Sequence, residues 1–165
     1  MKKVFALCSL LFVLCGLAAC GFSPMYMSDS SPRDDTRQIF VAPISGTNGI
    51  DLRNSLRAKF GTENDAAAKF TLNVRLENPY TVFKAIQITG DATWQEVRMI
   101  ASYELKETKT GKIVLTGSDT ASESYTFVRD LVASQASYNN AVQSTIRVLS
   151  EKINTRVAAT LAKKP

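Results

Sequence analysis

The residues that could carry chemistry are few, and the first is a cysteine at the end of an apolar run. Lys2 and Lys3 precede fourteen mostly apolar residues, 4–17, and small residues then lead into Cys20. A positive start, an apolar core and small residues at the end are typical of an export signal that is removed. The run is shorter than the roughly 20 residues that a membrane-spanning helix needs. The sequence therefore predicts a signal peptide at residues 1–19 and a mature chain that begins at Cys20.

The segment Leu17-Ala18-Ala19-Cys20 resembles the bacterial lipobox, whose cysteine is acylated. A thiol at this place can take a thioether-linked diacylglycerol, and small neighbours let a peptidase reach the backbone. One acyl chain binds a bilayer only marginally, whereas two or more anchor a protein stably. The alternative is a plain secreted protein with a chance cysteine at the cleavage point. We expect lipidation at Cys20 and a membrane contact through this anchor.

Other residue types that usually carry catalysis are missing or removed. The sequence has no histidine, which removes the commonest general base and metal ligand. Cys8 and Cys15 leave with the predicted signal, so the mature chain has no free thiol for a nucleophile or a zinc site. Paired carboxylates remain possible for hydrolysis of a glycosidic bond. The sequence-near pairs lie in polar, turn-like stretches: Asp34 with Asp35, and Glu63 with Asp65. We therefore expect no enzyme, no cofactor and no metal site.

The charge balance is mildly basic and bears on the kind of partner. The formal charge is +5, and it falls to +3 when Lys2 and Lys3 are removed with the signal. For an exported, lipidated chain, anionic lipid headgroups are more available than nucleic acid, so we expect no nucleic-acid partner. Four basic residues lie beside aromatic residues or flank a turn and are candidate contacts for an anionic headgroup: Lys84, Arg98, Lys109 and Lys112. The alternative for each is an ordinary solvated charge.

The elements that would position these residues follow from hydrophobic periodicity. Residues 27–38 are polar and contain Pro32, which is typical of a tether. Residues 39–43 suit a first strand, and Leu52, Leu56 and Phe60 have the spacing of an amphipathic helix. From Phe70 onward, alternating apolar and polar residues predict strands over 70–77, 80–88 and 95–106. Residues 106–112 suit a hairpin turn, and residues 113–127 a fifth extended segment that is either a sheet edge or a strand that fades into a loop.

The C-terminal third has the strongest helical pattern in the chain. From Tyr138 onward apolar residues recur at steps of three and four: Val142, Ile146, Leu149, Ile153, Val157 and Leu161. Strands with one apolar face and helices with one apolar stripe bury both by packing in layers. We therefore expect an α+β two-layer sandwich, with two helices on one face of a mostly antiparallel four- to five-stranded sheet. The predicted organisation is signal 1–19, lipidated N-terminus and flexible tether 20–38, and a single domain 39–165.

The predicted mature start, Cys20-Gly21-Phe22-Ser23-Pro24-Met25-Tyr26, resembles that of the LPS-assembly lipoprotein family LptE, especially its alphaproteobacterial members. Further segments occur in the order of that family: "TGDATW", "ASYEL", "TGKIVLTG", "SESYTF" and the long helix after them. The resemblance covers nearly the whole mature chain, and the N-terminal motif is its most specific part. Trp94 departs from it, because a smaller or basic residue is usual there.

This resemblance implies a non-catalytic subunit anchored in the outer membrane. Such a subunit sits in the lumen of the large LptD-like β-barrel that inserts lipopolysaccharide into the outer leaflet, helps that barrel assemble and can bind lipopolysaccharide. An exported domain without obvious catalytic groups fits a binding and scaffolding role. Two alternatives stay open at this point: an auxiliary lipoprotein of another envelope transporter, and a lipoprotein enzyme acting on cell-wall glycan.

Overall fold

A computed structural model describes residues 35–62, 67–86, 93–128 and 130–163. In chain order the elements are β1 (Ile39–Val41), α3 (Thr47–Phe60), β2 (Gly61–Thr62), β3 (Phe70–Leu76), β4 (Tyr80–Ile86), β5 (Thr93–Glu107), β6 (Ile113–Phe127) and α4 (Leu131–Ala162). The predicted signal peptide, Cys20 and residues up to 34 lie outside the described residues, and so do Glu63 and Asp65. The predictions for those residues stay predictions.

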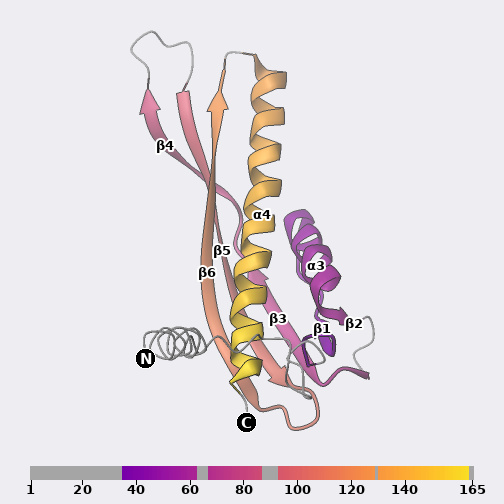
Figure 1. The fold of residues 1–165 in the computed structure, drawn as a ribbon. Helices are drawn as coiled ribbons and strands as arrows, with labels where there is room; N and C mark the ends of the chain where they lie inside the picture. The colour runs from indigo at the N-terminus through magenta and orange to yellow at the C-terminus, as the bar shows by residue number, and fades with distance from the viewer. Residues whose placement is uncertain (1–34, 63–66, 87–92, 129, 164–165) are drawn as a thin grey trace, which may run out of the picture. The chain divides into compact units, whose positions relative to one another are not determined.

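One six-stranded sheet is organised around the long strand β5 (Figure 1). Strand β6 pairs antiparallel along one edge of β5, from Thr93 to Lys106. The other edge is shared, because β4 pairs with the first half of β5 and β3 with the second half, both antiparallel. β1 extends the sheet parallel to β3, and β2 pairs parallel with β1. The sheet is therefore mixed but mostly antiparallel.

Both helices lie on the same face of this sheet (Figure 1). α4 runs along β6 and β5, and α3 packs beside α4 and over β1. Alternate residues of β5 face the helices and are buried: Val97, Met99, Ala101, Tyr103 and Leu105. The predicted α+β two-layer fold is thus confirmed, and the two-residue strand β2 brings the strand count to six.

α4 is longer at its start than the periodicity predicts, because it begins at Leu131 rather than near Tyr138. The Asp130 side chain caps it by accepting hydrogen bonds from the backbone N–H groups of Val132 and Ala133, at 2.9 and 3.1 Å. Hydrophobic periodicity does not predict the first turn of α4, because that turn has no buried apolar stripe. Its apolar residues Leu131 and Val132 are exposed. Its 32 residues make a rod of roughly 48 Å at about 1.5 Å per residue.

A polar bridge joins β5, β6 and α4, with Tyr103 and Asp119 buried and the Arg156 side chain 58% exposed. The Tyr103 hydroxyl donates to the Asp119 carboxylate at 2.6 Å, and Arg156 on α4 reaches the other oxygen of Asp119 at 3.0 Å. Burial, with the hydrogen bond to Asp119, raises the pKa of Tyr103. The Tyr103 ring covers Gly117, its partner across the strands, and a Cβ at residue 117 would lie 2.7 Å from that ring. Glycine is required there by this close approach.

Candidate functional site

Two of the four predicted basic contacts meet on the face of the sheet away from the helices. Lys84 on β4 and Arg98 on β5 each form an ion pair with Glu96, at 2.9 and 2.7 Å. The register of β4 against β5 shifts between Phe83 and Ala85, so Lys84 lies at a β-bulge. Glu96 is only 9% exposed, although it lies on the outer face. Sequence reasoning proposed the two cations but not the carboxylate that joins them.

The charges of this cluster hold one another in the ionised form. The hydrogen bond from Lys84, followed by that from Arg98, lowers the pKa of Glu96 against the opposing effect of burial. The Glu96 carboxylate, and then Tyr80, raises the pKa of Arg98. An anionic headgroup that approached Lys84 or Arg98 would therefore compete with an acid already in place. The cluster has one more cation than anion, so it remains weakly attractive to anions.

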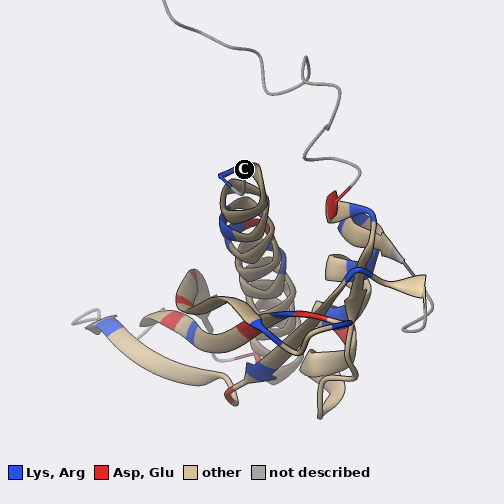
Figure 2. Cartoon of the chain, turned by 90° about the horizontal axis from the view of Figure 1, so that it is seen from below, with Lys and Arg blue, Asp and Glu red and all other residues tan. Residues whose placement is uncertain are grey.

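Lys109 and Lys112 lie at the opposite end of the β5–β6 hairpin. Both are exposed in the turn between the two strands, where Gly111 has a φ of +68°. Lys109 is eleven residues from Arg98 along the chain, or about 35 Å of extended strand. The four predicted residues thus form two separate groups. Figure 2 shows Lys and Arg interspersed with Asp and Glu along the strands, so the charges are not gathered on one patch.

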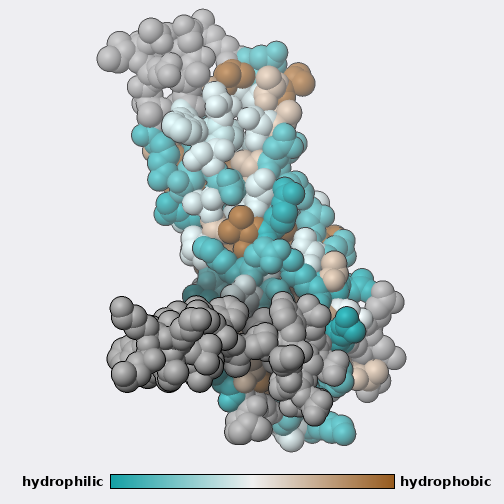
Figure 3. Space-filling view, in the orientation of Figure 1, coloured by the Kyte–Doolittle hydropathy of each residue, from teal (hydrophilic) through white to brown (hydrophobic). Residues whose placement is uncertain are grey.

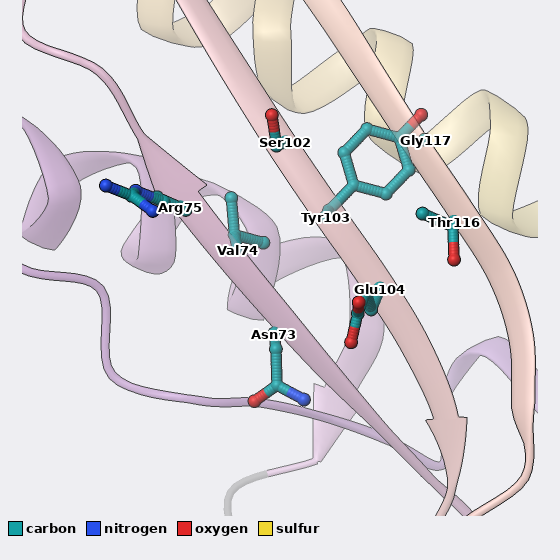
Figure 4. A pocket seen from close by; sticks show the side chains of 8 residues that line it. All are labelled: Asn73, Val74, Arg75, Ser102, Tyr103, Glu104, Thr116 and Gly117. Atoms are coloured by element: carbon teal, nitrogen blue, oxygen red, sulfur yellow. The ribbon is translucent and has the colours of Figure 1, made fainter.

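A hollow of about 310 Å³ lies on the outer face where β3, β5 and β6 run side by side (Figure 4). Its polar lining comes from Asn73, Arg75, Ser102, Glu104 and Thr116. Glu104 is paired with Lys106 at 3.0 Å. Among the residues that line this hollow Glu104 is the one carboxylate, whereas hydrolysis of a glycosidic bond normally uses two. This hollow therefore does not supply the pair of carboxylates that such hydrolysis normally uses.

Of the predicted acid pairs only Asp35 is described, since Asp34, Glu63 and Asp65 lie outside the described residues. Asp35 forms an ion pair with Lys69 at 2.7 Å. Over residues 35–62, 67–86, 93–128 and 130–163, no group of three or more His, Cys, Asp or Glu side chains could hold a metal ion. Within the same ranges, no helix has the length and apolar character to cross a bilayer.

Exposed apolar side chains lie on both faces of the end of the sheet that is formed by the end of β4, the start of β5, the end of β6 and the beginning of α4. We call this the apolar tip: Phe83, Trp94, Phe127, Leu131 and Val132. Leu131 and Val132 are 77% and 81% exposed. On the face drawn in Figure 3, brown apolar residues appear at the end where α4 begins. Sequence reasoning missed the tip, although the apolar residues that flank Asp130 were a visible signal.

Comparisons with known proteins identify the fold but no family. No family model and no curated protein matches this sequence. Among solved structures, a lipoprotein from Caulobacter crescentus CB15 matches with a TM-score of 0.66 at 19% identity, over 81% of this chain and 97% of that one. A minor lipoprotein from Acinetobacter baumannii matches with a TM-score of 0.57 at 16% identity, over 74% and 94% of the two chains. Rare lipoprotein B from Shewanella oneidensis matches with a TM-score of 0.51 at 12% identity, over 74% and 95%. The chain therefore has a fold that occurs in bacterial lipoproteins.

Proposed function

We propose that this chain is an outer-membrane lipoprotein subunit of the lipopolysaccharide transport and assembly machinery. It is anchored through lipidated Cys20, seated in the lumen of the LPS-inserting, LptD-like β-barrel, and assists the assembly of that barrel. It acts by binding and scaffolding rather than by catalysis. The observation that carries the proposal is the agreement of two independent signals. The CGFSPMY start resembles the LptE family, and the fold is similar to three bacterial lipoproteins.

The surface of the domain suits a plug in a barrel. Barrel interiors are polar, so a chain seated in one needs a polar outer surface. The outward positions of β3 and β5 include Asn73, Arg75, Ser102 and Glu104, and those of β6 from Thr116 to Thr126 carry only hydroxyl side chains. For lipopolysaccharide itself, Lys109 and Lys112 are the more available of the predicted cations, because Lys84 and Arg98 already contact Glu96.

Copurification of the lipidated full chain from its native membranes in mild detergent tests the partner. We expect a much larger outer-membrane β-barrel to stay bound, and depletion of the chain to leave that barrel misassembled and surface lipopolysaccharide reduced. A cytoplasmic-membrane transporter retained in place of the barrel, with normal surface lipopolysaccharide on depletion, would contradict the proposal and favour the transporter alternative.

The anchor is tested separately, by Cys20→Ser. Because Cys20 is the one thiol at the signal boundary, we expect this variant to remain uncleaved or to leave the membrane fraction. Mass spectrometry of the wild-type mature chain should find acyl groups on Cys20. An unmodified Cys20 in the mature chain would end the lipoprotein interpretation.

A further inference from the structure

The free edge of β6 presents backbone hydrogen-bonding groups over most of its length. Within the described residues, β6 pairs with β5 and with no other strand. Ile100 of β5 accepts a hydrogen bond from the Glu77 N–H, so its carbonyl points away from β6. Ile100 and its partner Thr120 are therefore a non-hydrogen-bonded pair, and the N–H and C=O of Thr120 point to the free edge. The Lys152 ammonium donates a hydrogen bond to the Thr120 carbonyl at 2.7 Å, as expected if that carbonyl points to the free edge.

Backbone N–H and C=O groups of β6 point to the free edge at every second residue, because the β5–β6 register is regular from Thr93 to Leu105. The N–H and C=O groups of Ser122, Ser124 and Thr126 therefore also face the free edge. Natural edge strands are usually short or protected by Lys, Pro, a bulge or an inward-pointing charge. β6 has 15 residues and contains neither Lys nor Pro; its register shift lies near Val114, and its helix-facing acids are Asp119 and Glu123. Lys152 covers the edge at Thr120, and among the described residues no strand pairs with the free edge from Ser122 to Phe127.

A groove runs beside this open stretch. Its volume is about 300 Å³, and its lining comes from two elements: Glu123, Ser124, Tyr125 and Thr126 of β6, and Ser137, Asn140, Ala141 and Ser144 of α4. That volume is at the lower end for ligand sites, so it suits a few side chains of an extended chain. A strand edge beside a helix is the arrangement by which peptides add to a sheet in domains that bind by β-augmentation.

We propose that the Ser122–Phe127 edge of β6 receives an extended segment of a partner protein, which pairs with β6 as an added strand and lies in the groove against α4. The groove wall is made mostly of small polar residues, so the segment carries small polar side chains toward it. Glu123 is the one charged side chain among the groove-lining residues, so a Lys or Arg of the segment faces it. This inference goes beyond the proposed function, because the partner need not be the β-barrel.

Strand β6 of a second copy does not meet those requirements. The charged residues of β6 are Asp119 and Glu123, both acidic, so β6 of another copy has no cation to place opposite Glu123. A symmetric pairing centred on Thr120 would also bring the two Lys152 ammonium groups together. The chemistry at this edge therefore does not favour pairing of β6 with its counterpart in a second copy.

Photocrosslinking of the full lipidated chain in its native host tests the proposal. A benzoylphenylalanine is placed at residue 122, 124 or 126 in turn, with residue 118 as the matched control. Ser118 is a serine of β6, as Ser122 and Ser124 are, and its backbone N–H and C=O also point to the free edge, but it does not line the groove. We expect one partner protein at the three groove positions and at least tenfold less product at residue 118. Mass spectrometry should map successive sites to partner residues two apart in a constant direction, which is the signature of strand pairing.

Substitutions separate backbone pairing from side-chain contact. With the crosslinker at residue 126, Ser124→Pro removes an edge N–H and should lower the yield at least tenfold. Ser124→Ala and Ser118→Pro should leave the yield within twofold, and Glu123→Lys should lower it at least fivefold. Unchanged thermal unfolding of the variants excludes loss of the fold.

Four outcomes would overturn the proposal: absence of a product at all three sites, crosslinks scattered over the partner, a second copy as the product, or equal losses for the two proline variants. Retention of the barrel in detergent is measured separately, so the proposed function can stand or fall independently.

Discussion

The middle of the β5–β6 hairpin is covered by the helices, whereas its open end near Phe127 is less covered. The same alternation of residue types runs through both regions. In the middle, Met99 and Tyr103 face the helices and are buried. At the end, Phe127 also faces the helix side but is partly exposed, and the neighbouring Leu131 and Val132 are almost fully exposed. The difference teaches that alternation assigns a residue to a face, whereas burial depends on whether another element covers that face.

The largest expected effect is in the covered region, from Leu149→Ala. Leu149 is fully buried on α4, so its truncation should cost about 2–5 kcal/mol of unfolding free energy. Leu131→Ala in the same helix should change stability by no more than about 0.5 kcal/mol, because the side chain is 77% exposed. Urea unfolding of the mature domain measures both. Equal effects would mean that this part of α4 does not cover the sheet as described.

Gly117→Ala is expected to have the next largest effect. The added methyl group would lie 2.7 Å from the Tyr103 ring, so the ring must shift, at a cost of about 1–3 kcal/mol. In a Tyr103→Leu background the same change should cost clearly less. A double-mutant cycle followed by thermal unfolding measures this coupling. The same cost in both backgrounds would show that the ring does not set the requirement for glycine.

A pH-dependent effect is expected from Glu96 on the outer face. Its pKa is lowered in the folded chain, so the folded state binds fewer protons than the unfolded state around that pKa. The stability from this group is therefore present above the unfolded value of 4.5 and is lost as the pH falls through the folded pKa. Urea unfolding at a series of pH values from 6 downward should show a smaller loss for Glu96→Gln than for wild type. Identical pH profiles would mean that the ion pairs with Lys84 and Arg98 do not contribute.

The smallest expected effect on stability is at the apolar tip. Val132→Ser replaces a side chain that is 81% exposed, so the unfolding free energy should change by no more than about 0.5 kcal/mol. Val142→Ser, a matched change on the buried stripe of α4, should be much more destabilising, because it buries a hydroxyl and removes packing. Thermal unfolding compares the pair. A large loss at Val132 would show that another part of the chain covers the tip.

Much of the fold could be predicted from the sequence because its signals are local. The helix-facing residues of β3 and β5, the stripes of both helices and the turn at Gly111 all follow from spacing and turn chemistry. The early start of α4 could not be found by periodicity, because its first turn is exposed and its signal is the single cap residue Asp130. Of the candidate site, spacing found Lys84 and Arg98 but not their shared partner Glu96, because the contact between Lys84 and Glu96 depends on the register of β4 against β5, which alternation within one strand does not give.

By itself the sequence determined the helical stripes, the strand alternation and the lack of histidine, and it predicts an export signal that ends at Cys20, because each depends on residue types at short spacing. Only the tertiary structure decided which residues far apart in the chain come together. It placed Lys84 on Glu96, Arg156 on Asp119 and the Tyr103 ring over Gly117. It also left one edge of β6 without a paired strand among the described residues, and set α4 beside it. The physical reason is that strand register and helix position arise from packing of the whole core, which no short segment specifies alone.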